Sequence, residues 1–137
     1  MLRLRVRIEV VKSSRSIEAI AIANSGFVGM EPEILIPSSI ARELKLYEVG
    51  EAETHMKITG DGREVGFLKY RELVKVYVVT EDRIEGPVIS TVIVSPTARY
   101  TLLNDKLLGK LKIVLLDFGE GIWCFKDELG VKERRSL

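Results

Sequence analysis

The chain has 137 residues, which fits one domain of ordinary size, and 46% of them are hydrophobic, enough to bury a core. Its 21 Lys and Arg residues nearly balance its 20 Asp and Glu residues, so the charge does not indicate a nucleic-acid partner. Cys124 is the only cysteine and His55 the only histidine, which excludes an internal disulfide and the usual four-ligand zinc site within one chain. We therefore expect no metal and no cofactor.

The residues from Met1 to Val10 alternate arginines with apolar side chains, unlike the apolar core of a signal peptide. No apolar run approaches the length that crosses a membrane. These features predict a cytoplasmic protein with no membrane partner. The sequence also has no glutamine, only two asparagines (Asn24 and Asn104) and 30% charged residues, a composition typical of proteins from thermophiles.

In the first part of the chain, apolar residues at every second position predict a strand over residues 2–10, with arginines on its solvated face. A second strand over residues 16–23 completes a hairpin. Residues 33–36, a glutamate and three apolar residues between two prolines, predict a third strand. Residues 37–46 predict a short helix, because a proline opens the segment and its apolar residues share one helical face.

The second part of the chain contains a Gly60-Asp61-Gly62 hairpin turn and several further strands. The expected elements are strands at residues 53–59, 65–79, 88–94, 112–116 and 122–125 and a short helix over residues 100–110. Many short strands, one or two short helices and glycine-rich turns predict a mostly-β closed barrel or sandwich. We expect the barrel domain to cover residues 1–126 and a charged, partly disordered tail to cover residues 127–137.

One turn stands out as a candidate site. The apolar run from Ile20 to Ala23 predicts a buried strand, and Asn24-Ser25-Gly26 follows it. Asparagine tolerates left-handed backbone geometry and glycine is permissive, so this is favourable turn chemistry. A polar turn at the end of a buried strand delivers side chains to the floor of a cleft, where sites are often built.

The segment Ile22-Ala23-Asn24-Ser25-Gly26-Phe27 resembles the active-site loop of the retropepsin-like (retroviral-type) aspartic proteases. In that family two apolar residues precede Asp-Thr-Gly or Asp-Ser-Gly, so Asn24 stands at the position of the catalytic aspartate. The resemblance extends from Arg5 to Phe125. It includes Ile34-Leu35-Ile36-Pro37 with the following helix, a hairpin over residues 58–65 that looks like the family's flap, and a late signature. That signature is Leu102-Leu103-Asn104, followed by Asp117-Phe118, and Asn104 stands where the family has glycine.

The resemblance implies a closed barrel of the acid-protease type and a twofold homodimer, in which each chain supplies half of the site. It implies that Asn24, Ser25 and Gly26 occupy the catalytic positions. It also implies that a peptide or protein substrate contacts Phe27 and the flap residues Gly60, Asp61 and Gly62.

An amide at position 24 changes what such a site can do. Aspartic proteolysis needs two carboxyls that share one proton, and an amide neither titrates nor acts as a general base. The resemblance therefore predicts a disarmed protein that binds extended peptide in a dimer cleft or serves as a dimeric scaffold. The alternative is an active endopeptidase, through an Asp-bearing partner chain, deamidation of Asn24, or an engineered Asp-to-Asn change.

A third hypothesis comes from another class of protein. Residues 34–46 also resemble the strand, proline and helix segment of swapped-hairpin DNA-binding antitoxins. Those domains are shorter and carry a basic face, and they leave the Asn24 turn and the Leu102-Leu103 segment unexplained. Binding to random duplex DNA that weakens steeply with salt would favour this hypothesis.

Other residues that can carry chemistry are predicted to have structural roles. His55 is expected on a strand face, and Cys124 is expected to be a small buried hydrophobe. Trp123 is expected to contribute to packing. Asp105 and Asp117 are candidates for capping or turn hydrogen bonds. Asparagine is also a common turn residue, so a purely structural role for Asn24 stays open.

Overall fold

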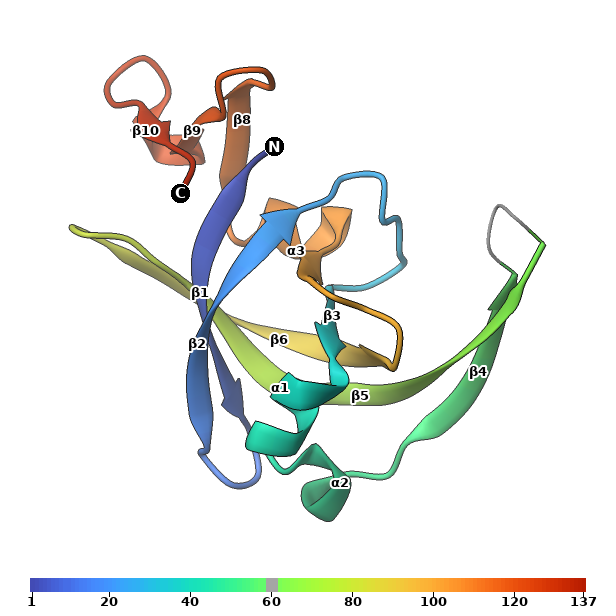
Figure 1. The fold of residues 1–137 in the computed structure, drawn as a ribbon. Helices are drawn as coiled ribbons and strands as arrows, with labels where there is room; N and C mark the ends of the chain where they lie inside the picture. The colour runs from blue at the N-terminus through green and yellow to red at the C-terminus, as the bar shows by residue number, and fades with distance from the viewer. Residues whose placement is uncertain (59–61) are drawn as a thin grey trace.

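A computed structural model describes residues 1–58 and 62–137 (Figure 1). Strands predominate, and the three α-helices are short. The elements in chain order are β1 (Arg3–Val10), β2 (Ser16–Ala23), β3 (Glu33–Pro37), α1 (Ser38–Glu43), α2 (Leu46–Val49), β4 (Glu53–Ile58), β5 (Glu64–Val79), β6 (Ile84–Ser95), β7 (Thr101–Leu103), α3 (Asp105–Lys110), β8 (Ile113–Asp117), β9 (Ile122–Phe125), the 3₁₀ helix η1 (Lys126–Glu128) and β10 (Arg134–Arg135).

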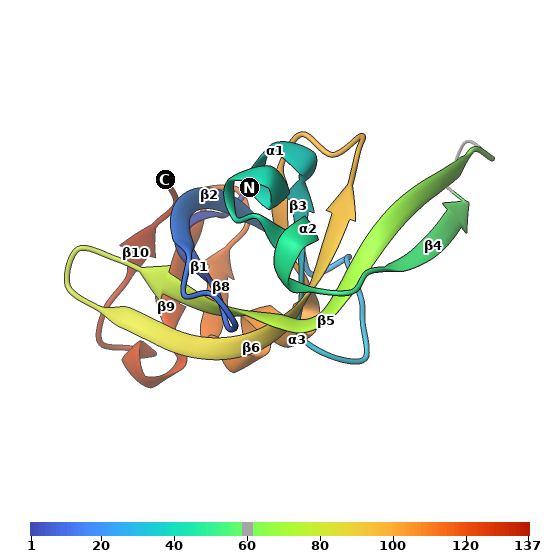
Figure 2. The same cartoon turned by 90° about the horizontal axis from the view of Figure 1, so that it is seen from below.

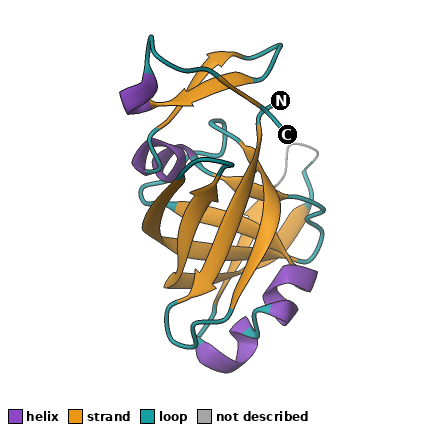
Figure 3. Ribbon diagram, turned by 90° about the vertical axis from the view of Figure 1, so that its left-hand side faces the viewer, coloured by secondary structure: helices purple, strands orange, loops and turns teal. Residues whose placement is uncertain are grey.

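Six of the strands close into a barrel. Their order is β1-β2-β7-β3-β6-β5, and an antiparallel pairing of β5 with β1 completes the ring. The barrel is mixed, because β2 pairs with β7 and β3 pairs with β6 in parallel. The expectation of a mostly-β closed barrel is confirmed. Helices α1 and α2 lie at one end of the barrel, and a separate sheet of β8, β9 and β10 lies at the other (Figures 1 and 3).

The barrel core follows from the alternation in β1. Every second side chain of this strand is buried, whereas the arginines between them lie on the outer face, as predicted. Burying each such aliphatic side chain contributes about 1.5–3 kcal/mol relative to exposure. The buried residues of β1 and the segment before it are Leu2, Leu4, Val6, Ile8 and Val10.

The β4–β5 hairpin extends away from the barrel on one side (Figures 1 and 2). β5 is continuous from the hairpin into the barrel, but its register with β6 shifts between Tyr70 and Val74. Glu72 lies in this interval with a φ of 47°, in the left-handed region. The irregularity thus begins at Tyr70. It lets one strand serve both the closed barrel and the projecting hairpin.

Both predicted helices differ from the observed ones. The helix expected over residues 37–46 ends at Glu43, and Lys45, with a φ of 53°, separates it from α2. Residues 100–110 do not form one helix, because β7 occupies Thr101–Leu103 and α3 starts only at Asp105. The side chain of Asn104 accepts a hydrogen bond from the Leu107 N–H at 2.9 Å, which fixes the start of the helix.

The charged tail was expected to be partly disordered, but it forms regular structure. It forms η1 and then β10, which pairs antiparallel with β9 through Arg134 and Trp123. The last residues also bond to the start of the chain, since the Leu137 N–H donates to the Arg3 carbonyl at 3.1 Å. The C-terminal sheet therefore extends into the segment that was expected to be a loose tail.

Candidate functional site

The Asn24-Ser25-Gly26 turn lies directly after β2 and is held by three backbone and side-chain bonds. The Asn24 N–H donates to the Leu103 carbonyl at 3.0 Å, which ties the turn to β7. The Phe27 N–H donates to the Asn24 carbonyl at 3.0 Å, and the Gly26 N–H donates to Asn24 Oδ1 at 3.1 Å. Asn24 is half-buried, whereas Ser25 and Gly26 are exposed. The turn presents its tip to solvent and keeps the amide of Asn24 in a defined position.

The first residue of α3 holds the other end of this loop. The Asp105 N–H donates to the Phe27 carbonyl, and Asp105 Oδ1 accepts from the Gly29 N–H, both at 3.1 Å. Desolvation alone would raise the pKa of Asp105. The backbone N–H groups of Gly29 and Lys106 outweigh it and hold the pKa below its usual range. Asp105 therefore acts on the loop as an ionised acceptor.

Asn104 lies fully buried behind the loop. Its Oδ1 accepts from the N–H groups of Glu33 and Leu107, each at 2.9 Å, and its Nδ2 donates to the Glu31 carbonyl at 2.9 Å. One side chain thus joins β3, α3 and the segment before β3. The resembled family has a glycine at this position, whereas here the amide fills the space with satisfied hydrogen bonds.

Gly29 is the loop residue that lies against the side chains of Asn104 and Glu33. A Cβ at position 29 would collide with the Glu33 carboxylate, and it would lie 2.7 Å from Asn104 Nδ2. Any larger residue must displace one of these side chains, because real Cβ contacts are not this short. Gly29 therefore allows the loop to lie directly on the Asn104 and Glu33 side chains.

Glu33 belongs to a charged group that the sequence analysis did not identify. Lys69 Nζ lies 3.7 Å from Glu33 Oε2 and 4.0 Å from Glu31 Oε1. Thr91 also donates to Glu31 Oε1 at 3.0 Å. Burial raises the pKa of Glu33, and the Lys69 ammonium opposes that rise. The available signal was a glutamate at the start of an apolar strand, where a charged side chain needs a partner.

The surface beside the turn is apolar. Val28 is 71% exposed and Met30 is 97% exposed, whereas Phe27 is half-buried. The residues that line a surface hollow of about 660 Å³ include Met30 and Glu31 and, from α3, Lys106 and Lys110. Asn24, Ser25 and Gly26 do not line this hollow.

The predicted substrate-contacting residues are only partly described. Gly60 and Asp61 lie outside the described residues. Gly62 is described, has a φ of 83° and has open space around it, so its glycine identity follows from backbone geometry. His55 lies on β4 and stacks on Phe67 of β5 with ring centroids 5.4 Å apart, which matches its expected strand-face position.

The remaining candidates have structural surroundings. Trp123 and Cys124 are buried in β9, and burial raises the pKa of the Cys124 thiol. Asp117 Oδ1 accepts from the Glu120 N–H at 2.9 Å within the β8–β9 turn. Among the described residues, no group of three His, Cys, Asp or Glu side chains is arranged to hold a metal ion. No helix in the described part of the chain is long and apolar enough to cross a membrane.

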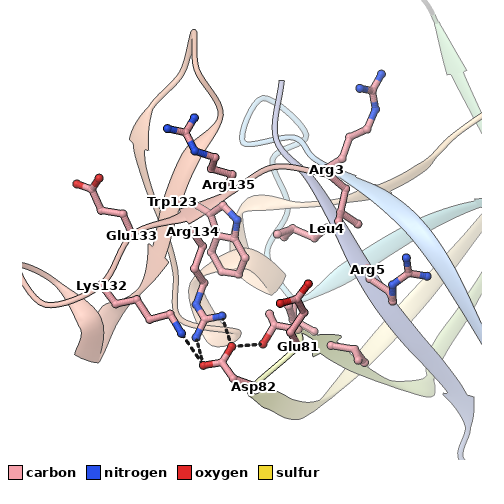
Figure 4. Close-up of a pocket in the computed structure, with 14 residues that line it drawn as sticks. Arg3, Leu4, Arg5, Glu81, Asp82, Trp123, Lys132, Glu133, Arg134 and Arg135 are labelled. Atoms are coloured by element: carbon pink, nitrogen blue, oxygen red, sulfur yellow. Dashed lines mark hydrogen bonds and ion pairs between the residues drawn. The ribbon is translucent and has the colours of Figure 1, made fainter.

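A second hollow, of about 560 Å³, lies where the C-terminal sheet meets the barrel (Figure 4). Asp82, at the β5–β6 turn, accepts from Arg134 and Lys132, each at 2.7 Å. Arg134 also donates to Glu128 at 2.7 Å, and this bond lowers the pKa of Glu128 to about 2. In Figure 4 the side chains of Arg3 and Arg135 point away from Asp82. Lys132 and Arg134 are thus already paired with carboxylates, and these pairs join the barrel to the C-terminal sheet.

Compared with models of known protein families and with curated protein sequences, the chain matches none. The assignment of a function therefore rests on the residues of the Asn24 turn and their surroundings.

Proposed function

We propose that the chain is a retropepsin-like aspartic-protease-fold protein whose site has lost its acid, and that it binds extended peptide between the Asn24 turns of two copies. The observation that carries the proposal is the turn itself. Asn24 follows a barrel strand, its amide is held by the Gly26 N–H at 3.1 Å, and Ser25 and Gly26 reach solvent. The closed β-barrel and the hairpin that projects from it agree with the same proposal.

The chemistry of the amide defines what the site does. Asn24 Nδ2 has no hydrogen bond to any described residue, so it has two N–H groups for a peptide carbonyl. Neither Asn24 nor the exposed Ser25 hydroxyl takes a proton from water at neutral pH, because neither titrates there. The site therefore binds the carbonyl groups of a peptide without cleaving that peptide.

The exposed Val28 and Met30 side chains support the dimer. Large apolar side chains exposed side by side mark interaction surfaces more often than isolated ones do. Val28→Glu and Met30→Glu are expected to shift the chain toward monomer in light scattering or sedimentation. Val131 is 86% exposed in the C-terminal segment, so Val131→Glu is the matched control and should leave the mass unchanged.

The function is tested by a peptide-library assay from about pH 3 to pH 7, the range in which paired carboxyls exchange one proton. The unheated wild type should bind library peptides without cutting them, and Asn24→Asp should cut them. Asn24→Ala should neither cut nor bind well, with affinity lower by about tenfold for about 1.4 kcal/mol of lost hydrogen bonding. Cleavage by the unheated wild type would contradict the disarmed site. No cleavage by Asn24→Asp would contradict the placement of the catalytic position.

A further inference from the structure

The two side-chain amides of this chain lie in opposite environments. Asn104 is fully buried, its oxygen accepts two backbone N–H groups and its nitrogen donates to a carbonyl. Asn24 is half-buried at the start of an exposed turn, and a small residue, Ser25, follows it. The chain has no glutamine, so any loss of a side-chain amide occurs at one of these two residues.

The turn supplies the groups that an intramolecular reaction of Asn24 needs. The nucleophile is the backbone nitrogen of Ser25, whose attack on Asn24 Cγ closes a five-membered ring. In the described part of the chain this N–H makes no hydrogen bond, so none has to be broken first. The Ser25 side chain is exposed and carries only a hydroxyl on Cβ, so it does not crowd the approach of the Ser25 nitrogen to Asn24 Cγ.

The Gly26 N–H contacts the oxygen of the same amide. It donates to Asn24 Oδ1 at 3.1 Å, and Oδ1 is the atom on which negative charge develops when Cγ is attacked. A backbone donor already aimed at a developing oxyanion lowers the barrier, because it needs no reorganisation during the reaction. The bond that shapes the turn thus also stabilises the intermediate of ring closure.

We propose that Asn24 is a self-modification site that the folded turn converts to aspartate. In the first step the Ser25 nitrogen bonds to Asn24 Cγ, the Cγ–Nδ2 bond breaks, and Nδ2 leaves as ammonia with the proton lost from Ser25. In the second step water adds to Cγ of the cyclic imide and the bond from Cγ to the Ser25 nitrogen breaks. The net reaction consumes one water, releases one ammonia and leaves a carboxyl at position 24.

The consequence of this conversion rests on the proposed function. If two chains meet at their Asn24 turns, conversion places carboxyls where the resemblance expects the catalytic pair. The chain is then a precursor that becomes competent with time and heat. The conversion itself does not depend on dimerisation or on peptide binding, so the two statements are tested separately.

The test follows the intact mass of purified wild type at elevated temperature and mildly alkaline pH, followed by peptide mapping. Heavy-oxygen water in the incubation labels the new carboxyl and excludes conversion before purification. The Asn24 peptide of the folded chain should gain about 1 Da in ordinary water, or about 3 Da in heavy-oxygen water, at least as fast as in denaturant, because the fold supplies the oxyanion donor. The Asn104 peptide should react only in denaturant. A folded rate at Asn24 below the denatured rate overturns the proposal.

Two substitutions at the exposed position 25 sharpen the test without touching the core. Ser25→Gly should speed the conversion, because glycine leaves the nitrogen unhindered. Ser25→Val should slow it by about tenfold, because a β-branched side chain restricts the approach. Equal rates for Ser25→Gly, Ser25→Val and wild type would overturn the proposed attack by the Ser25 nitrogen.

The outcomes for the two proposals are distinguishable. Conversion of Asn24 without peptide cleavage by the product supports the self-modification site and contradicts the proposed function. Cleavage by Asn24→Asp with no conversion in the wild type supports the function and overturns the self-modification site.

Discussion

Two regions join segments that are distant in the sequence, and they do so with different chemistry. Behind the Asn24 turn, the neutral amide of Asn104 joins β3 to α3 through buried hydrogen bonds. At the C-terminal sheet, Arg134 joins the β5–β6 turn to η1 through ion pairs with Asp82 and Glu128. Arg134 also lies over the Phe125 ring at 5.1 Å.

The difference concerns what each junction responds to. A buried neutral hydrogen bond does not titrate and is not screened by salt. Its loss leaves unpaired donors and acceptors in the core. An ion pair near the surface is screened by salt and fails when its carboxylate is protonated. The Asn104 junction should therefore hold over a wider range of pH and salt than the ion-paired junction at the C-terminal sheet.

The largest effect is expected for Asn104→Ala. The substitution removes the α3 cap and leaves the buried N–H groups of Glu33 and Leu107, and the half-buried Glu31 carbonyl, without this partner. The free energy of unfolding should fall by about 3 kcal/mol. Denaturant unfolding measures this loss. The matched control is Asn24→Ala at the half-exposed turn, which should cost less than about 1 kcal/mol. Equal losses for the two variants would contradict the contrast between them.

A smaller effect is expected for Arg134→Met. The side chain of Arg134 is 8% exposed, and its carboxylate partners are 13% and 49% exposed. These ion pairs are thus intermediate between buried and surface pairs. The free energy of unfolding should fall by about 2 kcal/mol at low salt and by less at high salt. Arg135 is the exposed neighbour in β10 with no ion pair among the described residues, and Arg135→Met should change little. A loss that does not depend on salt would show that packing, rather than charge, holds this sheet.

The smallest effect is the response of the C-terminal sheet to acid. The Arg134 guanidinium lowers the pKa of Glu128 to about 2 from an ordinary value of 4.5. A lowered folded pKa stabilises the fold above the ordinary value, and this contribution is lost as pH falls from 4.5 toward about 2. Fluorescence of Trp123, the single tryptophan, should therefore change over this range before the far-ultraviolet signal of the barrel does.

Glu128→Gln isolates the cause of that change. The variant keeps a hydrogen-bond acceptor near Arg134 but cannot titrate, so the fluorescence change in this range should shrink. Glu33 has a raised pKa and therefore acts in the opposite sense, contributing stability at low pH that is lost as pH rises. A fluorescence change that is unaltered in Glu128→Gln would assign the acid response to another group.

Much of the barrel could be predicted from local patterns. The alternation in residues 2–10 predicts both the strand and its buried face, because side chains of a strand point to opposite faces in turn. The turn at Asn24-Ser25-Gly26 was also predictable, since asparagine and glycine favour such geometry. The start of α3 was not, because a helical pattern over residues 100–110 does not show that Thr101–Leu103 pairs with β2 and β3.

The surroundings of the candidate site were less predictable than its turn. Asn104 was identified only as a residue in place of a glycine, and Glu33 was not identified at all. Asn104 lies against Gly29, and Glu33 pairs with Lys69, each across a long stretch of the sequence. No local pattern carries information about such pairs.

The sequence by itself determined the mostly-β character, the first hairpin and the position of the Asn24 turn, because periodicity and turn chemistry act between neighbouring residues. Only the tertiary structure decided that Asn104 supports that turn from within the core and that the charged tail pairs with β9. Both depend on barrel closure and on the placement of the C-terminal sheet. These bring together groups separated by many residues, such as Asp82 and Arg134.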